Sequence, residues 1–269
     1  MSDDDAAGFV GSIPENYDRG LGPIFFADYA EHTARLVAGY VPSRVLETGA
    51  GTGIVTRRLR DLLPVTTRLI ATDLNPPMLD VARTKFRPDE TVEFRQADAM
   101  ALPFDDASFD AAVCQFGVMF FPDKEKSYRE MCRVLAPGGR YVFSVWDGNY
   151  NRHNRIADEV AAQFFATDPP QFYRVPLSYS KIDPIKDSLS NAGFIDLRIA
   201  VVTRQKQVAD IGALARAMVY GNPLADMIRT RGGVDPDRVV DALGEAFARE
   251  FGNPAHLSLQ AIVFEATRP

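Results

Sequence analysis

The chain has 269 residues, 46% of them apolar, which suits one large α/β domain or a medium domain with a cap. Its 30 basic and 36 acidic side chains give a net charge of −6. This balance argues against a nucleic-acid partner, because duplex binding depends on clustered Lys and Arg. The longest weakly polar run, residues 111–122, is much shorter than the roughly 20 residues of a membrane span.

The amino terminus and the cysteines indicate the cellular compartment of the protein. The first residues, MSDDDAAG, lack the charged and apolar regions of a signal peptide. Cys114 and Cys132 form neither a metal-binding spacing nor a disulfide framework. We therefore expect a cytoplasmic protein with two reduced, largely buried thiols.

The first half of the chain alternates between short apolar stretches and amphipathic ones. Residues 1–22 are polar and rich in glycine, and we expect a flexible N-terminal segment there; residues 23–269 are expected to form a single domain. Strands are predicted at 43–49, 67–73, 91–98, 108–117 and 138–147, and helices at 23–41, 53–64, 76–86 and 123–137. Strands that alternate with helices at this spacing predict an α/β fold with a doubly wound, mostly parallel sheet.

The alternation breaks after residue 147. A helix and a Pro-rich loop are predicted within 149–180, a helix at 183–194, a strand at 195–208, two helices within 209–253 and a last strand at 256–268. The sheet is therefore expected to have seven strands. The helical insertions near 150–180 and 209–253 are expected to form a cap.

A glycine-rich turn, in the run VLETGAGTGIVT, follows the first predicted strand. Gly49, Gly51 and Gly53 allow a sharp backbone turn and a close approach of a ligand to the main chain. Asp73 ends the second strand, where a carboxylate can accept hydrogen bonds from ribose hydroxyls. The dinucleotide fingerprint needs a glycine where this chain has Ile54. The turn thus indicates an adenosine ligand and disfavours the alternative of an NAD-linked oxidoreductase.

Four ordered stretches resemble the class I S-adenosylmethionine-dependent methyltransferases: ETGAGTG, ATDLNPPMLDVA, RQADAMALPFDDASFDAAVCQFGVMFFPD and EMCRVLAPGGRYVFSVW. The likeness is closest to the small-molecule branch that resembles ubiquinone and menaquinone biosynthesis enzymes (methyltransferase type 11). It runs from about residue 15 to 147 and leaves the insertions outside. The resemblance implies a Rossmann-like fold, S-adenosyl-L-methionine as cofactor, and direct in-line methyl transfer to a small, partly hydrophobic acceptor.

The resemblance also implies roles for the matching positions. Glu47 and the glycine-loop backbone would hold the methionine portion of the cofactor, and Asp73 would bind both ribose hydroxyls. Asp98 would take the adenine amino group, unless it only caps the next turn as a solvated loop acid. Gln115 would border the sulfonium. The expected cofactor-binding residues are Tyr17, Glu47, Gly49, Ala50, Gly51, Gly53, Asp73, Leu74, Met78, Asp98, Ala99 and Gln115.

The tripeptide Asn75-Pro76-Pro77 needs its own interpretation. Followed by an aromatic residue, it is the signature of enzymes that methylate amino groups of DNA bases, where it follows the fourth strand. Here it follows the second strand and precedes Met78. Prolines can begin a helix, because the first helical N–H groups lack partners anyway. We interpret the tripeptide as a helix start with Asn75 as N-cap, and expect Met78 at the adenine face or in the core.

Catalysis and acceptor binding are expected near the cap. His153 is the candidate general base, because it follows the fifth strand on the ligand-facing edge; the alternative is a solvated surface histidine. Tyr17 is expected in a flap over the cofactor, or else in a mobile tail. The three histidines form no ligand cluster in sequence, and no metal is expected. The cap residues expected to enclose the acceptor, or to pack the cap onto the sheet, are Phe164, Phe165, Phe172, Tyr173, Tyr179, Met218 and Tyr220.

Two matters stay open at this point. The same motifs would serve a non-catalytic or repurposed S-adenosylmethionine-binding protein, since they establish binding rather than turnover. The oligomeric state is also open, and a homo-oligomer is compatible with the sequence.

Overall fold

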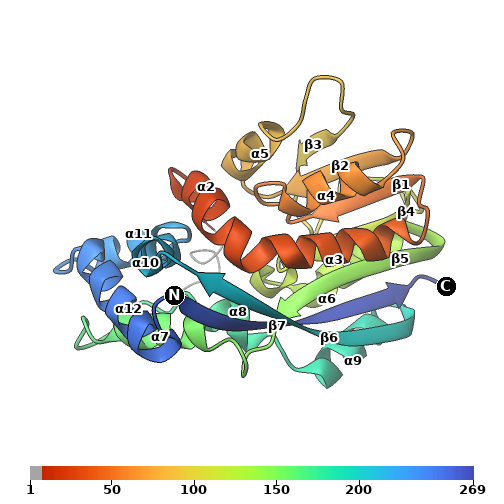
Figure 1. Ribbon diagram of the computed structural model, residues 1–269. Helices are drawn as coiled ribbons and strands as arrows, with labels where there is room; N and C mark the ends of the chain where they lie inside the picture. Colours follow the sequence, from red (N-terminus) through yellow and green to blue (C-terminus); the bar gives the residue numbers. More distant parts are fainter. Residues whose placement is uncertain (1–7) are drawn as a thin grey trace.

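The structure, a computed structural model, describes residues 8–269. A seven-stranded sheet with the order β3-β2-β1-β4-β5-β7-β6 forms its centre (Figure 1). The strands are β1 Arg44–Thr48, β2 Arg68–Asp73, β3 Glu93–Gln96, β4 Phe109–Gln115, β5 Leu135–Trp146, β6 Ile195–Val208 and β7 Ala255–Thr267. Neighbours among β1 to β5 run parallel, and β7 runs antiparallel to β5 and β6. The prediction of a seven-stranded, mostly parallel sheet is confirmed.

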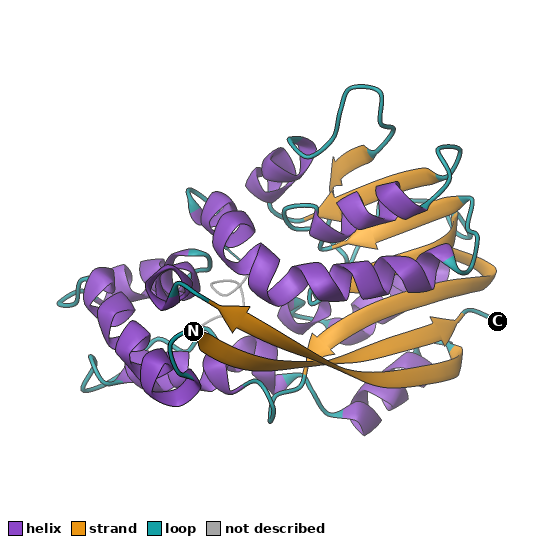
Figure 2. Cartoon of the chain, viewed as in Figure 1, coloured by secondary structure: helices purple, strands orange, loops and turns teal. Residues whose placement is uncertain are grey.

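Helices cover the sheet and also gather beyond one of its ends (Figure 2). The helices that alternate with the strands are α3 Ala27–Ala38, α4 Ile54–Leu62, α5 Pro76–Arg83, α6 Lys124–Val134 and α9 Ile182–Asn191. The central strand β4 is buried over most of its length, as expected for a parallel strand covered on both faces. Among residues 8–269, no helix is long and apolar enough to cross a membrane.

The two insertions supply the helices beyond the end of the sheet (Figure 1). These helices are α7 Arg152–Ala162, α8 Arg174–Ser178, α10 Ile211–Tyr220, α11 Leu224–Arg231 and α12 Pro236–Phe251. Helix α12 packs against α7 and α10, so the two insertions form one structure, which we call the cap. Residues 209–253 form three helices rather than the predicted two, because Gly221 ends α10 and Pro223 precedes α11. That residues 23–269 are a single domain stays a prediction.

The N-terminal segment is helical over most of its described residues. Helix α2 (Ile13–Asn16) continues into a π-helix (Tyr17–Phe26) that leads directly into α3. Residues 13–22 are thus helical, residues 1–7 lie outside the described residues, and the flexibility of the segment 1–22 stays a prediction. Tertiary packing overrides the low helix propensity of its glycines. At Gly20 a Cβ atom would lie 2.4 Å from that of Ala217, so this glycine allows close packing against α10.

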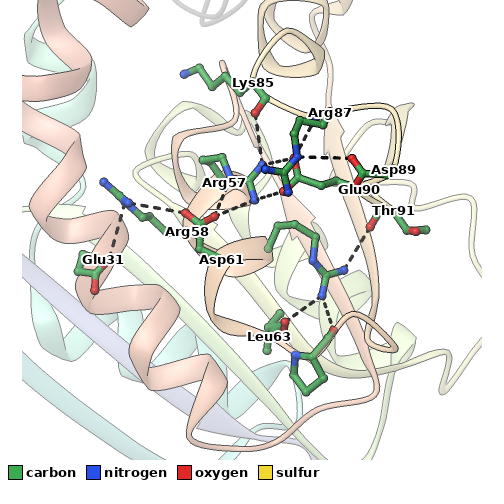
Figure 3. Close-up of polar contacts among 12 residues, drawn as sticks. Glu31, Arg57, Arg58, Asp61, Leu63, Lys85, Arg87, Asp89, Glu90 and Thr91 are labelled. Carbon is green, nitrogen blue, oxygen red and sulfur yellow. Dashed lines mark hydrogen bonds and ion pairs between the residues drawn. The ribbon is translucent and has the colours of Figure 1, made fainter.

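A polar network holds the segment between α5 and β3 against α4 (Figure 3). Arg57 donates to both carboxylate oxygens of Glu90 at 2.7 and 3.0 Å, and to Asp61 at 3.1 Å. Arg60 is buried and donates to the Leu63 carbonyl at 3.1 Å, among other main-chain oxygens. The connection that leads into the edge strand β3 is thus fixed by guanidinium groups.

Candidate active site

A cavity of about 510 Å³ lies at the carboxyl ends of the parallel strands, beneath the cap. Its sheet end is lined by residues that follow or end strands, among them Gly49 after β1, Asp73 on β2 and Gln115 on β4. The strand order reverses between β1 and β4, and such a switch point opens a crevice in which α/β proteins bind ligands. The volume is in the usual range for a small-molecule site.

The glycine loop has the conformation that its sequence predicts. Gly49, Gly51 and Gly53 have φ angles of 62°, 55° and 77°, a region that L side chains rarely adopt. Gly49 and Gly51 line the cavity. Gly53 does not line it: a Cβ atom there would lie 2.8 Å from the Cβ of Ala82, so Gly53 serves the packing of the loop against α5.

Asp73 is the best-defined polar group at the sheet end. Its side chain is buried, and its two carboxylate oxygens accept hydrogen bonds of 2.8 Å from the backbone N–H groups of Gly51 and Asn75. Burial raises the pKa of Asp73, and the backbone hydrogen bonds oppose this rise. Each oxygen keeps further acceptor capacity, so the fixed carboxylate can accept from two adjacent hydroxyls.

The tripeptide after Asp73 supports this carboxylate. Asn75 is the N-cap residue of α5 by position, but its side chain makes no capping hydrogen bond. Its backbone donates to Asp73 instead, and its side-chain amide lies 3.4 Å from the same carboxylate. Pro76 and Pro77 occupy the first helical positions, as predicted. The tripeptide therefore begins a helix and holds the acid in place.

An apolar strip with one further acid adjoins Asp73. Leu74 is 54% exposed yet lines the cavity, and Met78 is buried and lines it as well. Asp98 and Ala99 lie on the same wall. The Asp98 carboxylate accepts from the Met100 N–H at 2.8 Å, so it caps its own turn while facing the cavity. This wall offers the apolar surface and the acceptor that an adenine ring requires.

Two of the expected cofactor residues lie behind the loop rather than on the cavity wall. Glu47 is buried and accepts a hydrogen bond of 2.7 Å from the Thr56 hydroxyl, and burial raises its pKa to about 8. The Ala50 N–H donates to the Thr72 carbonyl at 2.9 Å and is therefore engaged within the fold. Direct cofactor contacts of Glu47 and Ala50 stay predictions.

The N-terminal π-helix closes one side of the cavity. Tyr17 lines the cavity and stacks on Phe26, with ring centroids 4.9 Å apart. The next residue, Asp18, accepts from the Thr52 hydroxyl at 2.7 Å and pairs with Lys85 just after α5. Asp18 thus fastens the helix that carries Tyr17 to the glycine loop. Asp18 was not predicted from the sequence, because a single acid in a polar, glycine-rich segment gives no signal of these contacts.

His153 lies in the first turn of α7 and lines the cavity. It is 2% exposed and stacks on Phe25 at a centroid distance of 4.7 Å. The alternative of a solvated surface histidine is therefore wrong. Burial lowers the pKa of His153 to about 3, so the imidazole is neutral at pH 7 and a weak base. This environment favours a hydrogen-bonding role; its role as a general base stays a prediction.

The predicted cap residues divide into two groups. Phe172, Tyr173 and Met218 line the cavity. Tyr179 instead bonds to the Tyr128 hydroxyl at 3.0 Å, and Tyr220 donates to Asp237 at 2.7 Å, so these two stabilise the cap and its attachment. Phe164 and Phe165 line a separate depression between α7 and α11.

The sequence analysis also missed several lining residues. They come from the N-terminal segment, the stretch that follows β4 and the cap: Phe9, Phe26, Phe116, Phe120, Asn154 and Asn222. Phe116 had a usable signal in the sequence, since it follows β4 directly. In the structure it stacks on Trp146 at the end of β5, with ring centroids 3.9 Å apart. Among residues 8–269, no cluster of His, Cys, Asp or Glu has the arrangement of a metal site.

Comparisons with known proteins agree with this geometry. A family model described as a methyltransferase domain matches residues 46–143. A demethylmenaquinone methyltransferase of Thermus thermophilus is 44% identical over 102 residues, which are 38% of this chain and 46% of that protein. The chain thus spans about half the length of that relative. A ubiquinone/menaquinone biosynthesis C-methyltransferase of Pseudomonas syringae pv. tomato is 31% identical over 186 residues, which cover 65% of this chain and 72% of that protein.

A solved structure extends the likeness to the whole fold. Phosphoethanolamine N-methyltransferase 2 of Haemonchus contortus, solved with phosphomonomethylethanolamine and S-adenosylhomocysteine, superposes with a TM-score of 0.62 at 17% identity. The match covers all of this chain and 61% of that one. At this identity the likeness concerns the fold. Taken with the extended Pseudomonas match, these findings show that the chain belongs to the class I S-adenosylmethionine-dependent methyltransferases, in the methyltransferase-domain family that includes the ubiquinone/menaquinone C-methyltransferases.

Proposed function

We propose that this chain transfers the methyl group of S-adenosyl-L-methionine to a small, partly hydrophobic acceptor. The observation that carries the proposal is one cavity with two unlike ends. At the sheet end lie the fixed carboxylate of Asp73 and the glycine loop, and at the cap end lie aromatic side chains such as Phe172. One end suits an adenosyl group and the other suits an apolar acceptor, so a single cavity can bring the two together.

The sheet end fits the family's cofactor. Asp73 would accept from both ribose hydroxyls, and Leu74 and Met78 would flank the adenine, with Asp98 accepting from its amino group. Gln115 would border the methionyl portion; its amide is held by the Thr33 hydroxyl at 3.2 Å. When bound, the cofactor supplies a methyl group activated by a sulfonium centre, so the protein needs to orient and desolvate the two partners.

The walls of the cavity provide that orientation and desolvation. Three aromatic side chains meet where the π-helix, β4 and β5 end: Phe26, Phe116 and Trp146. Phe116 stacks on Trp146, and Phe26 is tilted against both. All three are buried, so they exclude water from the middle of the cavity. Aromatic faces also attract a cation, which would favour the sulfonium of the cofactor at the point where the two ends meet. No proton-accepting residue is required where the acceptor loses its proton readily.

A second function keeps some support. The same sheet end would serve a non-catalytic S-adenosylmethionine-binding protein, because nothing in it depends on turnover. An NAD-linked oxidoreductase is disfavoured by Ile54, which begins α4 where the dinucleotide fingerprint has glycine. We further propose a cytoplasmic enzyme, in keeping with its free cysteines, and leave a homo-oligomer as an option.

Two measurements, made one after the other, test the proposal. Calorimetric titration with S-adenosylhomocysteine should show binding, whereas titration with NAD should show none. Incubation with S-adenosylmethionine and a panel of small phenols, amines, alcohols and carboxylic acids should release S-adenosylhomocysteine with at least one acceptor. Asp73→Ala should strongly reduce both signals, and replacing Asp80, an exposed acid on α5, by Ala should change neither. Binding without release across the panel would favour the non-catalytic function.

A further inference from the structure

The cap end of the cavity contains four polar side chains that differ in how well they are satisfied. Two of them, Tyr173 and Asn222, bond to each other: the Asn222 amide donates to the Tyr173 hydroxyl at 2.8 Å. Tyr173 donates in turn to the Met218 carbonyl at 2.7 Å, and the Asn222 oxygen accepts from the Leu224 N–H at 2.9 Å. These two side chains are therefore part of the cap's internal scaffold.

The other two, His153 and Asn154, have no such partners. They are 2% and 5% exposed, both line the cavity, and neither side chain makes a hydrogen bond with any of residues 8–269. Buried polar groups in proteins are nearly always paired, because an unpaired one has lost its bonds to water without replacement. The unpaired polar atoms of His153 and Asn154 are not fully enclosed, as those of His32 and Ser144 are, so they reach the open space of the cavity. A molecule bound there can therefore supply the partner that the protein does not.

The charges around the cavity limit what that molecule is. Of the described residues that line it, none is Lys or Arg, and the only carboxylates are Asp73 and Asp98 at the sheet end. An acceptor phosphate or carboxylate would lose its hydration at the cap end without gaining a counter-charge. The imidazole of His153 supplies no charge either, since burial keeps its pKa at about 3.

From these observations we infer that His153 and Asn154 form a subsite for an uncharged oxygen function of the acceptor, a hydroxyl or a carbonyl. The subsite makes the cap end selective for neutral acceptors. Asn154 can both donate and accept, and a neutral imidazole has one donor and one acceptor nitrogen, so the pair can satisfy a hydroxyl completely. Phe25 stacks on His153 and fixes its ring plane. This inference rests on the proposed function, because it assumes that the cap end is where the acceptor binds.

The test compares three probes of nearly equal size by calorimetry, with the chain saturated with S-adenosylhomocysteine. They are 2-naphthalenemethanol, which is neutral, 2-naphthoate, which is anionic, and 2-naphthylmethylammonium, which is cationic. The neutral alcohol should bind at least about tenfold more tightly than either ion, since an unpaired buried charge costs more than a hydrogen bond contributes. Absence of alcohol binding, or equal or tighter binding of either ion, would overturn the inference.

Variants locate the effect on the two side chains. His153→Leu and Asn154→Leu should each lower the affinity for 2-naphthalenemethanol by about three- to tenfold, which corresponds to the loss of one hydrogen bond. Neither variant should lower the affinity for 2-methylnaphthalene, which lacks the oxygen. His153→Gln, which keeps a hydrogen-bonding group, should lower the affinity for the alcohol less than His153→Leu does. Arg155→Ala, on the exposed side of the same turn, is the matched control. Equal losses for both probes would reduce the pair to a packing role and sink the inference.

This design separates two failures. If S-adenosylhomocysteine does not bind to the unmodified chain, the proposed function fails. If it binds to the unmodified chain and to both leucine variants alike while the alcohol shows no preference, only the inference about the subsite fails.

Discussion

The two ends of the cavity are built in different ways. At the sheet end the main chain defines the site: Asp73 is held by two backbone N–H groups, and the turn depends on glycine φ angles. At the cap end, helix side chains from separate insertions define the site, and the side chains of His153 and Asn154 have no hydrogen-bond partner among residues 8–269. Under the proposed function, the comparison teaches that cofactor binding would depend mainly on the conformation of the backbone, whereas acceptor choice would depend on replaceable side chains.

The largest expected effect is a loss of stability in the cap, which tests whether the two ends of the cavity bind their ligands independently. Phe247 of α12 is fully buried in the cap, so Phe247→Ala should lower the free energy of unfolding by about 3–5 kcal/mol. Urea denaturation measures this loss, and Glu245→Ala on the exposed face of the same helix is the control. Under conditions where the chain stays folded, naphthalenemethanol affinity should fall while S-adenosylhomocysteine affinity changes little. Equal losses would show that the two ends are not independent.

Replacing Asp73 tests the sheet end. Asp73→Ala removes an acceptor for two hydroxyls, and the affinity for S-adenosylhomocysteine should fall about 100-fold or more, because charge-assisted hydrogen bonds contribute about 1.5–3 kcal/mol each. Calorimetry measures the loss. Circular dichroism checks that the fold persists, since Gly51 and Asn75 lose an acceptor. A loss below threefold would contradict the assignment of the ribose site.

Asp18 links the N-terminal helix to the sheet end, and it should have an intermediate effect. Asp18→Asn weakens the contacts to Thr52 and Lys85 that hold Tyr17 over the cavity. We expect about a tenfold loss in S-adenosylhomocysteine affinity, which is about 1.4 kcal/mol. Thr52→Val should give a similar loss. The double variant should lose less affinity than the sum of the two single losses, because both substitutions affect the same contact between Asp18 and Thr52. Glu15→Gln, exposed on α2, should have no effect.

The smallest effect concerns a proton at Glu47. Its pKa of about 8 means that the carboxyl is mostly protonated at pH 7 in the free protein. If the ammonium of the methionyl portion binds nearby, it lowers this pKa, so binding releases up to about one proton and affinity rises with pH between about 6 and 8. Calorimetry in buffers of different ionisation enthalpy measures the release.

Glu47→Gln is the control for this proton, because Asp73 also titrates with a raised pKa. The proton release should disappear in that variant and persist in Thr56→Val, which removes only the hydrogen-bond donor. No release from the unmodified chain would restrict Glu47 to a structural role behind the loop. The same raised pKa makes the folded protein bind more protons than the unfolded one, so this group lowers stability as pH rises from about 4.5 to about 8.

Sequence patterns were most reliable where chemistry follows a strand end. Gly49 after β1 and Asp73 at the end of β2 were predicted from their places, Gln115 at the end of β4 was implied by the family resemblance, and all three line the cavity. Patterns were least informative for the N-terminal segment, because its polar, glycine-rich composition suggested mobility and a helix was predicted only from Pro23 onward. Its helical state depends on packing against α10, a helix some 200 residues later, and no local pattern reports such a contact.

The sequence by itself determined the sheet, the glycine turn and the acid that closes β2, because strand periodicity and turn residues act over a few neighbouring positions. The tertiary structure alone decided which side chains face the cavity at the cap end. It decided between the two interpretations of His153, on the ligand-facing edge or at the solvated surface, by burying it, and it placed Asn154 and Phe172 in the same cavity. Helices joined by long connections are oriented by side-chain packing, and that packing depends on residues far apart in the chain.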